Sequence, residues 1–235
     1  MAKHIENEIV RYYDLYPTRE DLMGETYIHR ILVEYLMDLL RWLFHGQHCA
    51  LYANLNFYQT PEYREEPLAP DIAIIQGVDV QEVTSWYVGK TGPAPQVIFE
   101  IGSAGTWKND LDDKPQQYAH MGVHEYFAYD PNKRPLRRGA PSRLFGWQLD
   151  RVSNEMRVMP LRSDGSLWST HLNSRLVPDG PYLRLYDQYG NLLLTRAEAT
   201  ERRADAEAAM RRIETERAKA LAEKLRSLGI DPDRI

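Results

Sequence analysis

The sequence contains almost no cysteine. Cys49 is the single cysteine in 235 residues, so no disulfide can form within the chain. Structural disulfides belong mainly to oxidising compartments, and we therefore expect a cytoplasmic protein. A structural zinc site would need a second pair of Cys or His ligands, which the sequence lacks beside His45 and His48. These two histidines are interpreted as part of a loop that follows a helix.

Long hydrophobic runs and a strong charge of one sign are also missing. No window approaches the roughly 18 apolar residues of a membrane span, and residues 1–17 carry no apolar core of signal-peptide length. We expect no membrane partner. The net charge is −5 and the pI about 5.8, which argues against a general polyanion binder, although a locally basic site remains compatible with nucleic-acid chemistry.

What is present is a series of periodic apolar segments. Residues 26–45 have apolar side chains at spacings of three and four, which predicts a helix ended by Gly46. Residues 114–121 predict a short helix closed by Gly122. Because proline is tolerated only in the first helical turn, Pro115 predicts that this helix begins at about 112 or 113. Strands are expected at 51–58, 71–76, 96–101 and 125–130. With a helix between them, the last two strands can run parallel.

The remainder of the chain changes character twice. The pieces "RLFGWQL", "MRVMPL", "SLWST", "YLRLYD" and "NLLLT" alternate and are separated by turn residues, which predicts a β meander. From 196 to 227 the composition shifts to Ala, Glu and Arg, which predicts a long helix, coiled-coil-like or docked on the domain or on a partner. We expect an α/β (α+β) fold with a mixed sheet, in two parts: residues 1–194 and a helical extension at 195–235.

Two carboxylates lie at the ends of predicted strands. Asp71 opens one strand and Glu100 lies near the end of the next. If these strands pair as neighbours, both side chains can point at one spot, and the carbonyl of Ile101 could add a third oxygen. Mg²⁺ prefers such oxygen ligands, and a bound metal ion can polarise a phosphoryl group. Taken singly, Asp71 is more typical of a turn and Glu100 of a solvent-facing strand position.

Several longer strings point to a family. "APDIAII", "PAPQVIFEIGS", "DDKPQQYAHMGVHEYFAYDP" and "AEKLRSLGIDPD" resemble the Uma-two family of bacterial restriction-endonuclease-like proteins, a branch of the PD-(D/E)xK nuclease superfamily. The resemblance spans nearly the whole chain and is strongest over residues 68–131. It implies a nuclease that hydrolyses DNA phosphodiester bonds with Mg²⁺, for which Mn²⁺ can substitute. It also implies that Asp71 and Glu100 bind the metal and are catalytic.

The lysine of this superfamily normally follows the glutamate by two residues, a position that Gly102 occupies here. The resemblance implies that Lys114, on the following helix, serves as the catalytic lysine instead, with Lys108 as the alternative. Tyr118 also matches the branch pattern. Glu25 is a further candidate, because it matches an acidic residue on the first helix of related nucleases.

Other polar residues have ordinary interpretations beside functional ones. Ser103 lacks the Gly-x-Ser-x-Gly context of a nucleophile elbow, so a hydrogen bond within its own turn is favoured. His29 is expected to be a packed or surface residue rather than a base. The basic run at 132–143 supplies four candidate DNA contacts, with a solvated loop as the alternative. These contacts are Lys133, Arg134, Arg137 and Arg138.

Two further hypotheses remain beside the DNA nuclease. The missing E-x-K lysine and the acidic pI are compatible with a non-catalytic nuclease-fold module that binds DNA or another protein. A metal-dependent hydrolase acting on RNA or a nucleotide would share the same site residues. For a nuclease that cuts both strands with one site per chain, we expect a homodimer, since a two-fold dimer is the commonest assembly.

Overall fold

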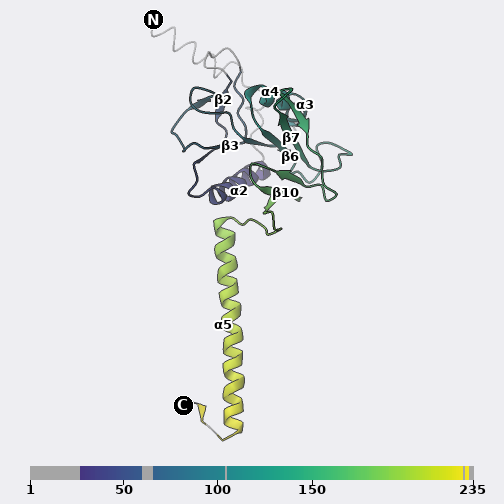
Figure 1. Cartoon of the computed structure of the whole chain (residues 1–235). Coiled ribbons are helices and arrows are strands. Elements are labelled where there is room, and N and C mark those ends of the chain that lie inside the picture. The colour runs from purple at the N-terminus through teal and green to yellow at the C-terminus, as the bar shows by residue number, and fades with distance from the viewer. Residues whose placement is uncertain (1–26, 60–65, 104, 230, 233–235) are drawn as a thin grey trace. The chain divides into compact units, whose positions relative to one another are not determined.

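A computed structural model of the chain describes residues 27–59, 66–103, 105–229 and 231–232. The chain divides into two compact units, residues 1–193 and 194–235 (Figure 1). The helices are α2 (Tyr27–Leu43), α3 (Trp107–Asp112), α4 (Lys114–Met121) and α5 (Arg196–Ser227). The first strands are β1 (Cys49–Tyr52), β2 (Asn56–Tyr58), β3 (Ile72–Gln76), β4 (Ser85–Tyr87), β5 (Val97–Ile101) and β6 (Glu125–Tyr129). The later strands are β7 (Leu144–Asp150), β8 (Glu155–Val158), β9 (Leu167–Ser169), β10 (Ser174–Asp179) and β11 (Tyr182–Tyr186).

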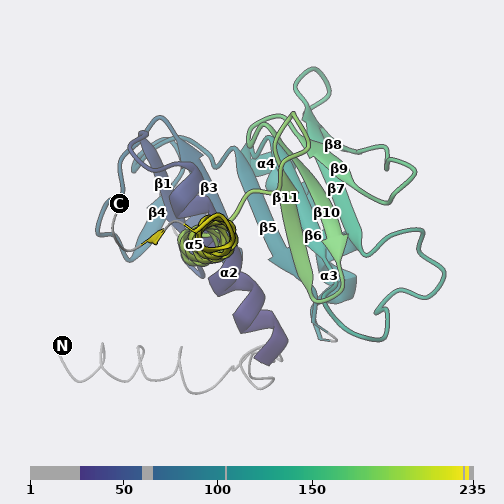
Figure 2. The ribbon, with the colours of Figure 1, turned by 90° about the horizontal axis from the view of Figure 1, so that it is seen from below.

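A mixed six-stranded sheet forms the centre of the first unit, in the order β1-β3-β5-β6-β7-β8 (Figure 2). β3 is antiparallel to β5, with Ile72 opposite Phe99. β5 and β6 are parallel, and the chain crosses between them through α3 and α4, as a parallel pair requires. The predicted mixed α/β fold is confirmed, and the strands that carry Asp71 and Glu100 are neighbours.

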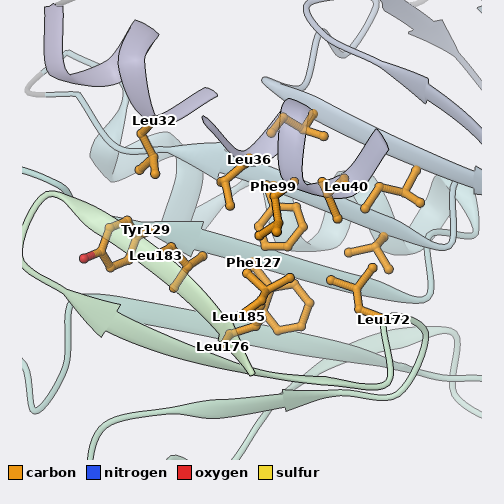
Figure 3. Packing of buried hydrophobic residues seen from close by; sticks show 14 of the residues in the cluster. Leu32, Leu36, Leu40, Phe99, Phe127, Tyr129, Leu172, Leu176, Leu183 and Leu185 are labelled. Carbon is orange, nitrogen blue, oxygen red and sulfur yellow. The ribbon is translucent and has the colours of Figure 1, made fainter. Parts of the chain in front are cut away.

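The sheet has an apolar core on each face. On one face, Leu32, Leu36 and Leu40 of α2 pack over Phe99 and Phe127 (Figure 3). The small sheet β11-β10-β9 contributes further leucines to this core: Leu167, Leu176, Leu183 and Leu185. On the other face, α3 and α4 pack against the central strands through aromatic side chains: Trp107, Tyr118, Tyr126 and Trp147.

β5 is buried along its whole length between these two cores. Successive side chains of a strand point to opposite faces. Val97, Phe99 and Ile101 belong to the core beneath α2. Ile98 belongs to the core beneath α4, so Glu100, two residues on, points to the same side as Ile98. The carboxylate of Glu100 therefore faces α4 from the interior.

Two elements in the first half of the chain differ from the prediction. The expected strand 51–58 is two strands, because Asn54 adopts a left-handed conformation (φ 53°) that turns the chain between β1 and β2. β2 then pairs in parallel with β4. β4 lies in a stretch that was expected to be a polar connection, and it is fixed there by Trp86, which is fully buried.

Three further features differ from the prediction: one additional helix, the first residue of another helix, and one strand that does not form. The short helix α3 was not predicted. α4 spans the predicted residues 114–121, but the earlier start at about 112 or 113 inferred from Pro115 is not observed, since Asp113 is the N-cap and Pro115 lies in the first turn. The expected strand "NLLLT" does not form: Leu192 makes a single bridge to Tyr186 before α5 begins. The other predicted meander strands are present.

The second unit consists mainly of α5, which spans the predicted range. Thr195 caps its N-terminus: its side chain accepts a hydrogen bond from the Glu198 backbone, and the Glu198 carboxylate accepts one from the Thr195 backbone. Met210, Ile213, Leu221 and Leu228 are exposed along it. No helix in the described ranges combines the length and the apolar character needed to cross a membrane.

Candidate active site

Asp71 and Glu100 meet inside the first unit, at the end of β5. Asp71 directly precedes β3, and its Oδ2 accepts a hydrogen bond of 2.6 Å from the backbone N–H of Ile101. Asp71 is 8% exposed and Glu100 is 4% exposed. Glu100 is thus a buried residue rather than a solvent-facing strand residue, and a charge buried so deeply requires compensation.

His29 on α2 is the second partner of Asp71. Its Nε2 lies 3.1 Å from Asp71 Oδ2, the same oxygen that Ile101 binds. Within the described ranges, Asp71 Oδ1 has no hydrogen bond or ion pair. His29 was expected to be a packed or surface residue, although its position in the sequence placed it on the buried face of the helix. It precedes Leu32 and Leu36 at helical spacing and therefore lies on the buried face of α2.

Glu100 has both of its described contacts on one oxygen. The Tyr118 hydroxyl donates to Oε1 at 2.5 Å, and Lys114 Nζ lies 3.0 Å from the same atom. Oε2 has no described partner. Burial raises the pKa of Glu100 to about 8, and the negative charges of Asp71 and Asp110 add to this rise, against the opposing effect of Lys114.

Asp110 on α3 joins the site and was missed by the sequence analysis. Its Oδ1 lies 2.8 Å from Lys114 Nζ, and its Oδ2 accepts a hydrogen bond of 2.9 Å from Thr106 Oγ1. It is 1% exposed, and burial raises its pKa. Lys114 bridges Asp110 and Glu100, and these two carboxylates raise its pKa against the opposing effect of burial. The available signal was the spacing of four residues between Asp110 and Lys114.

The structure gives a physical reason why the lysine does not follow Glu100 by two residues. That position is Gly102, and a Cβ atom placed there would lie 2.5 Å from Cε3 and 2.7 Å from Cζ3 of Trp107. Any side chain at Gly102, lysine included, would collide with this indole ring. The cation beside Glu100 therefore comes from α4.

The charges of the cluster do not balance. With His29 neutral, Asp71, Glu100 and Asp110 would carry three negative charges when ionised, against one positive charge on Lys114. A divalent cation would offset the remaining two. Asp71 Oδ1 and Glu100 Oε2 are the carboxylate oxygens left for it. Among the described residues, no group of three or more Asp, Glu, His or Cys is placed so that it could hold a metal ion by itself.

Of the remaining predicted site residues, some contact the carboxylate cluster and others do not. Tyr118 belongs to it. Ile101 contributes its N–H to Asp71, while a ligand role for its carbonyl stays a prediction. Lys108 is exposed on α3 and makes none of the described contacts with the carboxylates. Ser103 Oγ lies 3.0 Å from Thr106 Oγ1, within its own turn. Glu25 lies outside the described residues.

The predicted DNA contacts lie on the loop between β6 and β7. All four side chains are exposed: Lys133, Arg134, Arg137 and Arg138. The loop starts at the C-terminal end of β6, next to the end of β5 where Glu100 lies. The basic run is thus on the same edge of the sheet as the carboxylates.

Comparisons with known proteins identify the family of the chain. A model of the Uma2 (Uma-two) family, described as "Putative restriction endonuclease", matches residues 18–168. No curated protein matches the chain. Among solved structures, one similar chain is described as "a putative nuclease belonging to DUF820" from Anabaena variabilis. The two share 12% identity with a TM-score of 0.43, over 63% of this chain and 75% of the other.

Proposed function

Because the chain belongs to the Uma2 family, we propose that it is a metal-dependent endonuclease that hydrolyses DNA phosphodiester bonds. The observation that carries this proposal is the buried excess of carboxylates around Lys114. Two carboxylate oxygens there, on Asp71 and Glu100, have no described partner. Mg²⁺ fits this set of ligands, and Mn²⁺ is expected to replace it.

Each residue of the cluster has a distinct task in this proposal. Asp71 Oδ1 and Glu100 Oε2 would hold the metal ion, which polarises a phosphoryl oxygen and lowers the pKa of a bound water. His29 fixes the Asp71 carboxylate and Tyr118 fixes that of Glu100, so that the remaining oxygens stay in place. Lys114 supplies a positive charge next to the scissile phosphate, where negative charge develops.

DNA is the proposed partner, and a homodimer is the proposed assembly. Each chain provides one cluster of this kind in its described part, so cleavage of both strands of a duplex would use two chains. The exposed apolar residues of α5 are available for such an assembly, and the coiled-coil interpretation of this helix stays a prediction.

Cleavage of supercoiled plasmid tests the proposal. We expect nicking or linearisation in Mg²⁺ or Mn²⁺, no cleavage in EDTA, and no cleavage by Glu100→Gln. The matched control is Glu155→Gln, which changes an exposed glutamate on β8 and should leave cleavage unchanged. Calorimetric titration with Mn²⁺ should show binding to the wild type and none to Glu100→Gln. Absence of both cleavage and Mn²⁺ binding in the wild type would favour the non-catalytic module instead.

A further inference from the structure

The basic loop between β6 and β7 (residues 130–143) is hydrogen-bonded to the end of the sheet where Glu100 lies. The carboxylate of Asp130 accepts hydrogen bonds from the backbone N–H of Asn132 at 2.9 Å and of Leu136 at 2.8 Å. The side-chain amide of Asn132 donates to the carbonyl of Gly102 at 3.2 Å. Asp130 is 1% exposed, and the three hydrogen bonds are partly buried. The loop is thereby bound to Gly102, which follows Glu100 by two residues in the sequence.

Its cations face outward without carboxylate partners. Lys133, Arg134, Arg137 and Arg138 are exposed, and none of the four forms an ion pair with any residue that the structure describes. Arg137 instead lies over the ring of Phe145, with its guanidinium carbon 5.9 Å from the ring centroid. Unpaired cations on an ordered loop are suited to contacts with phosphate groups.

An apolar pocket adjoins two of these arginines. It has a volume of about 510 Å³, and its lining includes Arg137, Arg138, the aromatic residues Phe145 and Trp147, and aliphatic residues such as Leu161. Both aromatic residues of the lining have ring partners in the core. Trp147 stacks on Tyr126 with 5.1 Å between ring centroids, so that its plane is fixed. Pockets of this size with apolar walls and a few charged groups are typical of ligand sites.

The pocket adjoins the active site through one chain of contacts. The ring of Phe145 meets that of Trp107 edge-on, with centroids 5.3 Å apart, and the ring of Trp107 packs against Gly102. Phe145 and the Glu100 carboxylate thus lie on the same face of the sheet, and the basic loop begins beside the end of β5.

We infer that this pocket accepts an unpaired nucleobase of the substrate while the loop arginines contact the adjoining phosphates. Bases stack on aromatic rings in proteins that bind single strands, with cations along the backbone. A base inside a duplex cannot enter a pocket unless it is turned out of the stack. The substrate is then a single-stranded or splayed polynucleotide. This inference rests on the proposed function, because it assumes that the substrate is a nucleic acid.

Binding in EDTA tests the inference without cleavage. Fluorescence anisotropy would compare a labelled single-stranded 12-nucleotide DNA, the duplex of the same sequence, and the single strand with its central bases replaced by abasic sites. We expect the intact single strand to bind more tightly than both of the others. An affinity for the duplex or for the abasic strand equal to that for the intact strand would overturn the inference.

Substitutions distinguish the contribution of the Phe145 ring to binding from that of the loop arginines. Phe145→Leu should weaken binding of the intact single strand by about tenfold, and Phe145→Tyr, which keeps a ring, should restore it. A plot of log affinity against log salt concentration has a negative slope. The double variant Arg137→Ala/Arg138→Ala should make this slope less steep by about 1.4, because two phosphate contacts are lost. The charge-matched control Arg211→Ala/Arg212→Ala, on α5, should leave that slope unchanged. Binding by Phe145→Leu within twofold of the wild type, in a variant with unchanged circular dichroism, contradicts the pocket assignment.

The two proposals fail in different ways. A protein that cleaves plasmid in Mg²⁺ yet shows no preference for the intact single strand retains the proposed nuclease function and loses the pocket. A protein that prefers the intact single strand through Phe145 but does not cleave under any metal retains the pocket and loses the nuclease function.

Discussion

Replacing Glu100 with glutamine should stabilise the metal-free protein, and the gain should grow as the pH rises. Glutamine keeps the shape of the side chain and can still accept the hydrogen bond from Tyr118, but it carries no charge. In the wild type, burial raises the pKa of Glu100 from 4.5 to about 8. The folded state therefore holds a proton on Glu100 at pH values where the unfolded chain has already released it.

The pH window and the magnitude follow from these two values. The favourable contribution of a group with a raised folded-state pKa is fully present below the unfolded pKa and disappears as the pH rises to the folded pKa. Between about pH 4.5 and 8, each pH unit should lower the free energy of unfolding of the wild type by about 1.4 kcal/mol relative to Glu100→Gln. Above pH 8 the difference should level off at about 5 kcal/mol.

Urea unfolding in EDTA at pH 5, 6, 7, 8 and 9 measures this difference directly. The exposed control Glu155→Gln should stay within about 0.5 kcal/mol of the wild type at every pH. Excess Mg²⁺ should stabilise the wild type but not Glu100→Gln, because only the native site binds the ion. A difference between wild type and Glu100→Gln that is flat from pH 5 to 9 would refute the reasoning, since Glu100 would then titrate alike in both states.

Three other substitutions test contacts within the site and the N-terminal cap of α5. Lys114→Met should cost about 3–5 kcal/mol in urea unfolding at pH 9, because it leaves two buried carboxylates without their cation; Lys108→Met, an exposed control, should cost less than about 0.5 kcal/mol. Gly102→Ala should lower stability by about 1–3 kcal/mol and shift the near-ultraviolet signal of Trp107, and an unchanged melting temperature would contradict the predicted clash. Thr195→Ala should speed amide exchange in the first turn of α5, at a cost of about 1 kcal/mol, whereas exchange at the wild-type rate would argue against the capping box.

The central strands could be read from the sequence because each is a short apolar run between turn residues. The segments around β3, β5 and β6 contain few polar residues apart from the functional carboxylate, as expected for strands covered on both faces. The long helix α5 was equally clear, because its composition changes abruptly at Arg196 and its end is marked by Gly229.

Short helices and strands that are held by only one or two buried side chains could not be predicted from the sequence. β4 is three residues long and is held by Trp86 in a polar stretch. α3 has six residues, of which only Trp107 and Asp110 are buried, so its apolar period is too short to recognise. Asp110 was missed for the same reason. In both places tertiary packing, rather than local propensity, selects the conformation.

The sequence by itself determined which residue types stand at the ends of β3 and β5, and hence that Asp71 and Glu100 could meet. Only the tertiary structure decided how they meet. His29 of α2 and the backbone of Ile101 in β5 contact Oδ2 of Asp71, and Lys114 of α4 contacts Oε1 of Glu100. Which oxygens remain available depends on distances between segments separated by tens of residues. Such distances are set by the packing of two helix layers against one sheet, and no local pattern in the chain records them.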